Sequence, residues 1–177
     1  MKYIKLRNSN IEISQIGLGT WAYSNDVWGP TDEAQAINTI HYVIDSGVNL
    51  IDTAPIYGYG HSETIVGKSI KNRRNKVFLA TKCGLIGRGK NITHNLSRKS
   101  ILKEIDDSLS RLQTDYIDLY QCHWPDANTP LSETMEVLNE IKKSGKIRFI
   151  GVSNFNSDQL AVAEKYSEIT TLQVPIS

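Results

Sequence analysis

The sequence predicts an α/β fold of the (β/α)8 TIM-barrel type that is incomplete in this chain. Short runs rich in β-branched and aromatic residues alternate with amphipathic helical patterns, and no change of composition marks a linker. Polar side chains follow the predicted strands, at the end of the barrel where such folds assemble their reactive residues. We therefore expect residues 1–177 to form a single barrel domain.

The composition is that of an ordinary globular protein. Of 177 residues, 40% are hydrophobic and 22% are charged, so a packed core is expected rather than disorder. A net charge of +1 gives no electrostatic signature of nucleic-acid or anionic-membrane binding. No apolar run approaches the roughly 18 residues of a membrane span, and the first residues lack the apolar segment of a signal peptide. We expect a cytoplasmic protein.

The predicted elements begin with a short β-hairpin that turns at Asn8–Asn10. Six strands are expected at residues 15–20, 48–54, 76–82, 116–123, 146–154 and 170–175. Five helices are expected to begin at Thr31, Ser62, Ser97, Thr129 and Asn156, which are residue types that favour helix N-termini. Gly47 and Gly145 are expected to end the first and fourth helices, and Asn156 with Gln159 predicts a capping box.

The first strand contains a Gly-x-Gly pair, Gly17 and Gly19, which raises a second α/β architecture. A doubly wound nucleotide-binding sheet would continue from these glycines directly into a helix, with a third glycine. Here the glycines lead instead into Thr20, Trp21 and a long loop. The missing third glycine favours the barrel.

Four side chains suited to proton transfer lie at or just after predicted strand ends, namely Asp52, Tyr57, Lys82 and His123. Taken singly, each has an ordinary structural explanation, such as a loop cap or a solvated surface residue. In a barrel, however, the strand ends converge on one rim, so we expect these four side chains to meet there.

This set matches the needs of carbonyl reduction. A phenol is protonated at neutral pH, and a neighbouring ammonium lowers its pKa and makes it a better acid. Lys82 would supply that charge to Tyr57, and Asp52 would hold the lysine in place. His123 would donate a hydrogen bond to the carbonyl oxygen as negative charge develops on it.

Neutral polar side chains at later strand ends suit a carboxamide ligand. Ser153, Asn154 and Gln173 offer paired donors and acceptors without charge, although ordinary turn chemistry is an alternative for Asn154. Trp21, Trp28 and Trp124 lie in or beside the same loops and would line an apolar substrate pocket, with core packing as the alternative.

Two further features have open interpretations. Cys83 and Cys122 fit no metal-type spacing, so we expect buried thiols and no metal site. The glycine-rich, basic loop Cys83–Leu96 is either an ordinary surface loop or a lid over the pocket.

Five runs together resemble the signature motifs of the aldo-keto reductases in order and spacing. They are GLGTW (17–21), DTAPIYGYGHSE (52–63), ATK (80–82), RLQTDYIDLYQCHWPD (111–126) and GKIRFIGVSNF (145–155). The likeness covers nearly the whole chain, and it is strongest to bacterial members of the general stress protein type.

The resemblance implies NADPH-dependent reduction of small aldehydes or ketones, with the cofactor binding first. Residue by residue, it implies that Tyr57 is the acid and that Asp52, Lys82 and His123 are its catalytic partners. The cofactor contacts would be Thr20, Trp21, Asp52, Ser153, Asn154 and Gln173. The substrate contacts would be Trp21, Tyr57, His123 and Trp124.

The chain departs from the family pattern near its end. Relatives usually have a tyrosine and an asparagine where this chain has Ile176 and Ser177, and a complete barrel needs about 250 residues. We therefore expect the last two strand–helix units to be lacking, with weak cofactor binding and little turnover by the chain alone. Open sheet edges would favour self-association or a complementing chain.

Two other functions stay open. The same barrel serves as a cofactor-sensing, non-catalytic channel subunit in animals, and the chain would also fit an inert remnant of a split gene. The complete set of Asp52, Tyr57, Lys82 and His123 favours the enzyme.

Overall fold

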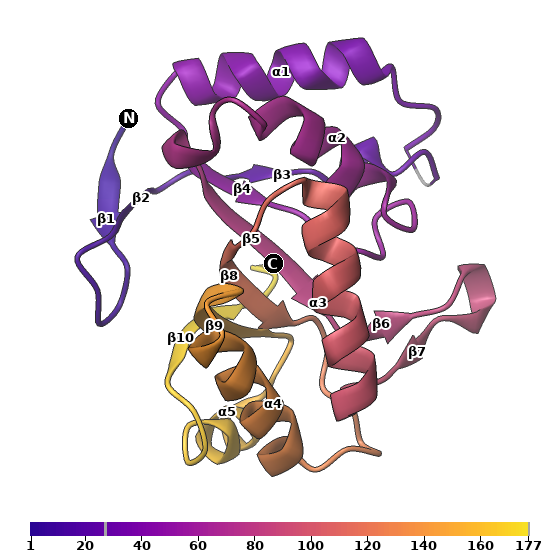
Figure 1. The fold of residues 1–177 in the computed structure, drawn as a ribbon, viewed down its shortest axis with the longest axis vertical. Coiled ribbons are helices and arrows are strands. Elements are labelled where there is room, and N and C mark those ends of the chain that lie inside the picture. The colour runs from indigo at the N-terminus through magenta and orange to yellow at the C-terminus, as the bar shows by residue number, and fades with distance from the viewer. Residues whose placement is uncertain (27, 177) are drawn as a thin grey trace.

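A computed structural model of the chain describes residues 1–26 and 28–176, and it contains one six-stranded parallel sheet flanked by helices (Figure 1). The order across the sheet is β10–β9–β8–β5–β4–β3. These strands are β3 (Leu18–Gly19), β4 (Leu50–Asp52), β5 (Phe78–Cys83), β8 (Ile117–Cys122), β9 (Ile147–Ser153) and β10 (Ile169–Gln173). All neighbouring strands of this sheet run parallel, so their carboxyl ends form one rim.

Five α-helices follow the strands in the order that the sequence predicts. They are α1 (Glu33–Asp45), α2 (His61–Ile70), α3 (Arg98–Leu112), α4 (Leu131–Lys143) and α5 (Ser157–Ala163). Each helix contacts the next along the outside of the sheet, as Figure 1 shows. This is an incomplete (β/α)8 barrel, and the predicted fold class is confirmed. Short 3-10 helices lie at Trp21–Tyr23, Arg74–Lys76 and Gly89–Asn91.

The helix starts differ from the sequence prediction in three places. Asp32, not Thr31, is the N-cap of α1, and its side chain accepts from the backbone N–H of Gln35. Helix α2 begins at His61 after Gly60, one residue before Ser62. Pro130 takes the N-cap position of α4, because the hydroxyl of the predicted Thr129 donates to Asp126 instead.

The remaining helix signals are confirmed. Ser97 is the N-cap residue of α3, although no side-chain bond caps the helix there. Asn156 and Gln159 form the predicted capping box of α5. Gly47 and Gly145 follow the ends of α1 and α4 with φ values of +89° and +84°, a region that glycine adopts without a steric penalty.

The segment that was predicted as a loop, Cys83–Leu96, contains an antiparallel hairpin. Its strands are β6 (Leu85–Ile86) and β7 (Thr93–His94), which are too short to give an alternating pattern in the sequence. The hairpin extends from the carboxyl end of β5, away from the body of the sheet (Figure 1). It therefore stands beside the rim.

The predicted N-terminal hairpin is also present, formed by β1 (Tyr3–Lys5) and β2 (Glu12–Ser14). Leu6 and Ile13 from this hairpin segment pack against Phe78, Ala80 and Leu119 on the sheet. This cluster is separate from the larger core between the sheet and the helices. The two hairpins lie on opposite sides of the view in Figure 1.

A buried charge lies inside strand β8, near its amino end. Asp118 in β8 is 2% exposed, and its carboxylate accepts from Arg74, Arg148 and the backbone N–H of Leu79. Its three donors mark it as a structural anchor near the amino ends of the strands.

Two remaining expectations concern the membrane and the chain end. None of the helices in the described residues has the length and hydropathy needed to cross a bilayer. Ile176 is almost fully exposed, while Ser177 lies outside the described residues.

Candidate active site

The structure brings the four predicted catalytic side chains together at the rim. Lys82 Nζ lies 2.7 Å from both carboxylate oxygens of Asp52 and donates to the backbone carbonyl of Thr53 at 3.0 Å. The same nitrogen lies 3.4 Å from the Tyr57 hydroxyl. Lys82 is only 1% exposed, so its charge is held by these partners rather than by water. We call Asp52, Tyr57, Lys82 and His123 the tetrad.

The loop after β4 fixes the direction of Tyr57. Gly58, Tyr59 and Gly60 all have positive φ, which makes three consecutive left-handed residues. A Cβ on Gly58 would lie 2.1 Å from the backbone oxygen of Ser24, so only glycine fits there. This turn leads directly into α2 and aims the Tyr57 side chain back at Lys82.

The acidity of Tyr57 differs from the sequence expectation. Burial raises the pKa of Tyr57 above its ordinary value of 10.0, and the Lys82 ammonium only partly opposes that rise. The expected lowering effect of the Lys82 ammonium is present, but the net pKa is raised because the loss of hydration outweighs it. The phenol stays fully protonated at neutral pH.

His123 faces Tyr57 edge to face, with the ring centroids 5.9 Å apart. Burial, reinforced by the positive charge of Lys82, lowers the pKa of His123 to about 3. The imidazole is therefore neutral at physiological pH and keeps one ring N–H as a donor. The Asn154 side-chain amide donates to the backbone carbonyl of His123 at 2.9 Å and ties the end of β9 to the end of β8.

Ser153, Asn154 and Gln173 lie together on the other side of the rim. The Ser153 hydroxyl donates to the backbone carbonyl of Gln173, and the Asn154 amide reaches the Ser153 hydroxyl. Gln173 in turn donates to Asp52 at 3.4 Å and accepts from Gln121. Sequence reasoning missed Gln121, a strand residue whose amide turns inward to this cluster.

Three of the tetrad residues, Tyr57, Lys82 and His123, line a pocket of about 540 Å³. Its apolar walls come from Trp21, Ile56, Leu85, Ile92 and Trp124, and Ser153, Asn154 and Gln173 also line it. Trp21 stacks on Tyr57 with ring centroids 6.2 Å apart, and Trp28 meets Trp21 edge to face. Leu85 and Ile92 belong to the 83–96 segment, so this hairpin forms one wall of the pocket.

Two of the predicted cofactor contacts, Thr20 and Asp52, do not line this pocket, and Thr20 is the more deeply buried of the two. It is 0% exposed, and its hydroxyl donates to the backbone carbonyl of Asp52 at 3.0 Å. Ser62, which was expected to begin α2, donates its hydroxyl to the backbone oxygen and the hydroxyl of Thr20. Both residues lie beneath the tetrad rather than in contact with a ligand.

The two cysteines are buried as expected. Cys83 and Cys122 face each other in the register of β5 and β8, and both are free thiols. The hydrogen bond with the Cys122 thiol, together with burial, holds the pKa of Cys83 well above its ordinary value. Among the described residues, no group of three or more metal-binding side chains occurs.

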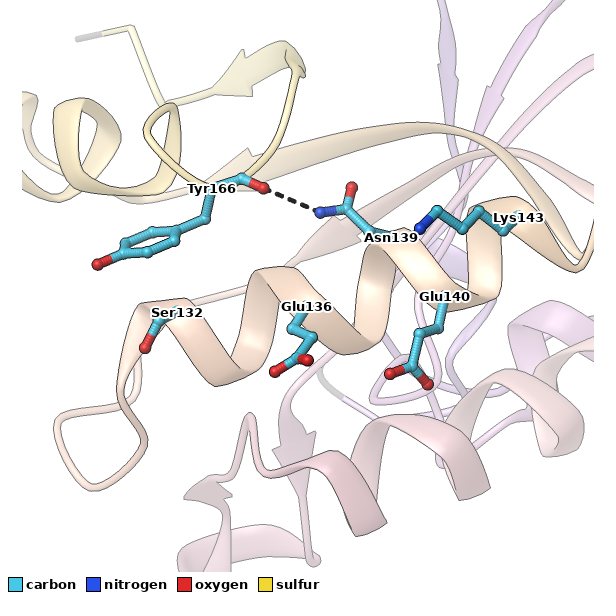
Figure 2. Close-up of a pocket in the computed structure, with 6 residues that line it drawn as sticks. All are labelled: Ser132, Glu136, Asn139, Glu140, Lys143 and Tyr166. Atoms are coloured by element: carbon cyan, nitrogen blue, oxygen red, sulfur yellow. Dashed lines mark hydrogen bonds between the residues drawn. The ribbon is translucent and has the colours of Figure 1, made fainter.

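A second hollow of about 450 Å³ lies on the outer surface, along α4 and the turn after α5. Figure 2 shows Asn139 donating to the backbone of Tyr166, with Glu136, Glu140 and Lys143 beside them. These side chains come from the helical face of the fold, and none of the tetrad residues lines this hollow. The side chains suited to proton transfer therefore lie at the rim and not at this outer hollow.

Comparison with known proteins agrees with this arrangement. The sequence profile of the "Aldo/keto reductase family" matches residues 15–177. Aldo-keto reductase YhdN of Bacillus subtilis is 49% identical over 177 residues, which cover 99% of this chain and 54% of the relative. NADH-specific methylglyoxal reductase of Escherichia coli is 42% identical, and the match covers 100% of this chain and 59% of the relative.

The fold is shared with solved structures as well. The holo form of aldo-keto reductase AKR11C1 from Bacillus halodurans superposes with a TM-score of 0.91 at 35% identity, covering 100% of this chain and 58% of that one. The chain thus spans somewhat more than half the length of the relatives it matches. On the profile match, the high identity and the shared fold, the chain belongs to the aldo/keto reductase family.

Proposed function

We propose that this chain carries the proton-transfer site of a reductase that converts small aldehydes or ketones to alcohols, with NADPH as the reductant and Tyr57 as the proton donor. One observation carries the proposal. The Tyr57 hydroxyl lies 3.4 Å from the Lys82 ammonium, in a pocket that the neutral His123 ring also lines. This is the arrangement that protonation of a developing alkoxide requires.

The pocket fits the nicotinamide end of such a cofactor. The Ser153 hydroxyl oxygen can accept a hydrogen bond while the hydroxyl donates to Gln173. The side-chain oxygen of Asn154 accepts none of the hydrogen bonds found among the described residues. A carboxamide offers two N–H donors, for which these two oxygens are acceptors. The rings of Trp21 and Tyr57 provide a flat apolar surface beside them.

When bound, a reduced nicotinamide would supply the hydride for the carbonyl carbon. The chain's own residues would act on the oxygen. The neutral His123 ring donates an N–H to the carbonyl oxygen and orients it, and Tyr57 transfers its phenolic proton to that oxygen as negative charge builds. Lys82 stabilises the resulting phenolate, and Asp52 keeps the ammonium charged and in place. The Trp21 and Trp124 side chains exclude water from an apolar substrate.

Because little turnover is expected from residues 1–177 alone, the decisive test compares two tyrosine variants of the protein with its barrel completed, either by further strands or by a second chain. Tyr57→Phe removes the proton donor, whereas Tyr42→Phe removes an exposed hydroxyl on α1. We expect reduction of 4-nitrobenzaldehyde to fall on the order of 10²- to 10⁴-fold in Tyr57→Phe and to stay unchanged in Tyr42→Phe. Equal rates in both variants would show that the proton comes from elsewhere. Cofactor binding without any turnover would favour the non-catalytic, cofactor-sensing alternative.

The preference for NADPH over NADH is a separate part of the proposal, since the Escherichia coli relative is named NADH-specific. We propose that the described residues around the pocket hold only the nicotinamide end of the cofactor, which is the same in NADPH and NADH. The preference is therefore tested by fluorescence titration with both cofactors. Tighter binding of NADH would show that NADH is the preferred cofactor, and the proposed role of Tyr57 would be unaffected.

We also propose that residues 1–177 belong to one barrel domain of a cytoplasmic protein and that the outer edges of β3 and β10 pair with further barrel strands or with a second chain. Both strands end the sheet among the described residues, and an unpaired edge is prone to association. Size-exclusion light scattering tests this point. A stable monomer of 19.9 kDa with one cooperative unfolding transition would contradict it.

A further inference from the structure

The first turn of α2 carries two buried polar residues for which the proposed proton transfer has no use. Ser62 and Glu63 are both 0% exposed, and α2 begins directly after the loop that carries Tyr57. Polar groups buried to this degree must be hydrogen-bonded, and their partners determine what they hold in place.

Ser62 joins the ends of two strands. Its hydroxyl donates to the backbone oxygen of Thr20 at 2.9 Å and lies 2.8 Å from the Thr20 hydroxyl and 3.2 Å from the Thr53 hydroxyl. Thr20 donates in turn to the backbone carbonyl of Asp52, and the backbone carbonyl of Thr53 accepts from Lys82. One serine hydroxyl thus connects the segments after β3 and β4 directly beneath the Asp52–Lys82 pair.

Glu63 holds the next strand. Its carboxylate accepts from the Thr81 hydroxyl at 2.7 Å and pairs with Arg111 of α3 at 2.6 Å. Thr81 immediately precedes Lys82 in β5, and its side chain leaves the sheet on the opposite face. The carboxylate therefore fixes the backbone of β5 one residue before the catalytic lysine.

We infer that Ser62 and Glu63 are positioning residues for the tetrad. Together they lock the first turn of α2 onto the ends of β3, β4 and β5, and that turn begins four residues after Tyr57. We call Ser62 and Glu63, with their hydrogen-bond partners, the clamp. The clamp sets the distance of 3.4 Å between the Tyr57 hydroxyl and Lys82 Nζ. The inference rests on the proposed role of Tyr57 as proton donor.

Two matched pairs of variants test this positioning role in the same completed barrel, in which turnover can be measured. Ser62→Ala removes the hydroxyl that reaches the strands. Its control is Ser69→Ala on the same helix, where the hydroxyl is also buried but donates only to the backbone of Ile65. Thr81→Val removes the partner of Glu63 and keeps the branched shape, whereas Thr81→Ser keeps the hydroxyl.

Two readouts separate positioning from general stability. In kinetics of aldehyde reduction, we expect Ser62→Ala and Thr81→Val to lower kcat on the order of tenfold with KM nearly unchanged, because the misplaced proton donor affects the reaction more than binding. In NMR titration of tyrosine labelled at Cζ, with Tyr57 assigned from Tyr57→Phe, the pKa of Tyr57 should rise further in both variants. The reason is that Lys82, which lowers it, has moved away. Ser69→Ala and Thr81→Ser should match the parent in both readouts.

The outcomes distinguish this inference from the proposed function. If Ser62→Ala and Thr81→Val match their controls in kcat and in the Tyr57 titration, the clamp has no positioning role. If Tyr57→Phe keeps full activity, the proposed function is wrong, yet the Tyr57 titration still reports whether Ser62 and Thr81 hold Lys82 near the phenol. Should Ser62→Ala fail to fold in thermal melting, the Thr81 pair decides the question.

Discussion

The hydroxyl oxygen of Tyr59 accepts a hydrogen bond from the backbone N–H of Gly89 at 2.9 Å, which joins the loop after Tyr57 to the far end of the β6–β7 hairpin. The guanidinium of Arg88 lies 4.5 Å from the centre of the Tyr59 ring and adds a second contact. Since Ile92 of this hairpin lines the pocket, Tyr59 holds a wall of the active site in position.

Removing this hydroxyl should loosen the hairpin without unfolding the protein. A net loss of about 1 kcal/mol in Tyr59→Phe would raise the population of the open hairpin roughly fivefold. Trypsin cleavage after Arg88 or Lys90, which lie at the hairpin end, should accelerate by the same factor under native conditions. Tyr42→Phe serves as the matched control, and an equal cleavage rate in both variants would show that the Tyr59 contact does not hold the hairpin.

The buried carboxylate of Asp118 should dominate stability at the amino ends of the strands. Asp118→Asn removes a charge that two arginines share, and we expect the free energy of unfolding to fall by about 3 kcal/mol. Asp107→Asn breaks an exposed helical pair with Lys103 and should cost only about 0.3 kcal/mol. Urea denaturation followed by circular dichroism measures both. Similar midpoints for the two variants would contradict the anchoring role.

Glu104 should make stability fall as pH rises. Burial raises the pKa of Glu104 from 4.5 to about 7, although the backbone N–H of Gly84 and the Ser100 hydroxyl favour the charged form. Between these two pKa values the folded protein retains a proton that the unfolded chain has lost, so its contribution is complete below pH 4.5 and is lost as pH rises through 7. The loss is on the order of 3 kcal/mol.

Glu104→Gln tests this directly, because glutamine stays neutral and keeps the acceptor for Gly84. The stability of the parent relative to Glu104→Gln should decline from pH 4.5 to 7.5 in urea titrations. A flat line would mean that the Glu104 carboxyl titrates normally.

His123 should stay neutral across the physiological range. With its pKa lowered to about 3, the ring signals in NMR should show no midpoint between pH 5 and 8. The unfolded chain protonates near pH 6.5, so this histidine contributes stability that is complete above pH 6.5 and is lost as pH falls toward 3. Assignment comes from the signal absent in His123→Asn. A midpoint near 6.5 would show that the ring is hydrated and would remove its role as a neutral donor.

The sequence was most informative where chemistry follows a strand end. Asp52, Lys82 and His123 each come at or directly after a recognisable hydrophobic run, so the parallel sheet was enough to bring them together. The surroundings of the Thr20 and Ser62 hydroxyls, by contrast, could not be predicted from the local sequence. A threonine or serine near a helix start is ordinarily a cap or a ligand contact, and only the three-dimensional packing shows that these two hydroxyls bond to each other beneath the site.

Other features depend on distances that no local pattern encodes. The hairpin strands of two residues each are below the length at which alternation is visible. The raised pKa of Tyr57 follows from how deeply the ring is buried, and the Glu104 carboxyl reaches Gly84 from a helix twenty residues further along the chain.

The placement of the indole rings gives this protein a built-in optical probe. All of its tryptophans, Trp21, Trp28 and Trp124, lie in the loops around the rim, and the sheet-and-helix core contains none. Emission excited at the red edge of the absorption band therefore records the surroundings of the rim, including Trp21 and Trp124 in the pocket wall. A change of emission without a change of circular dichroism will report movement at the mouth of the barrel while the strands and helices behind it remain intact.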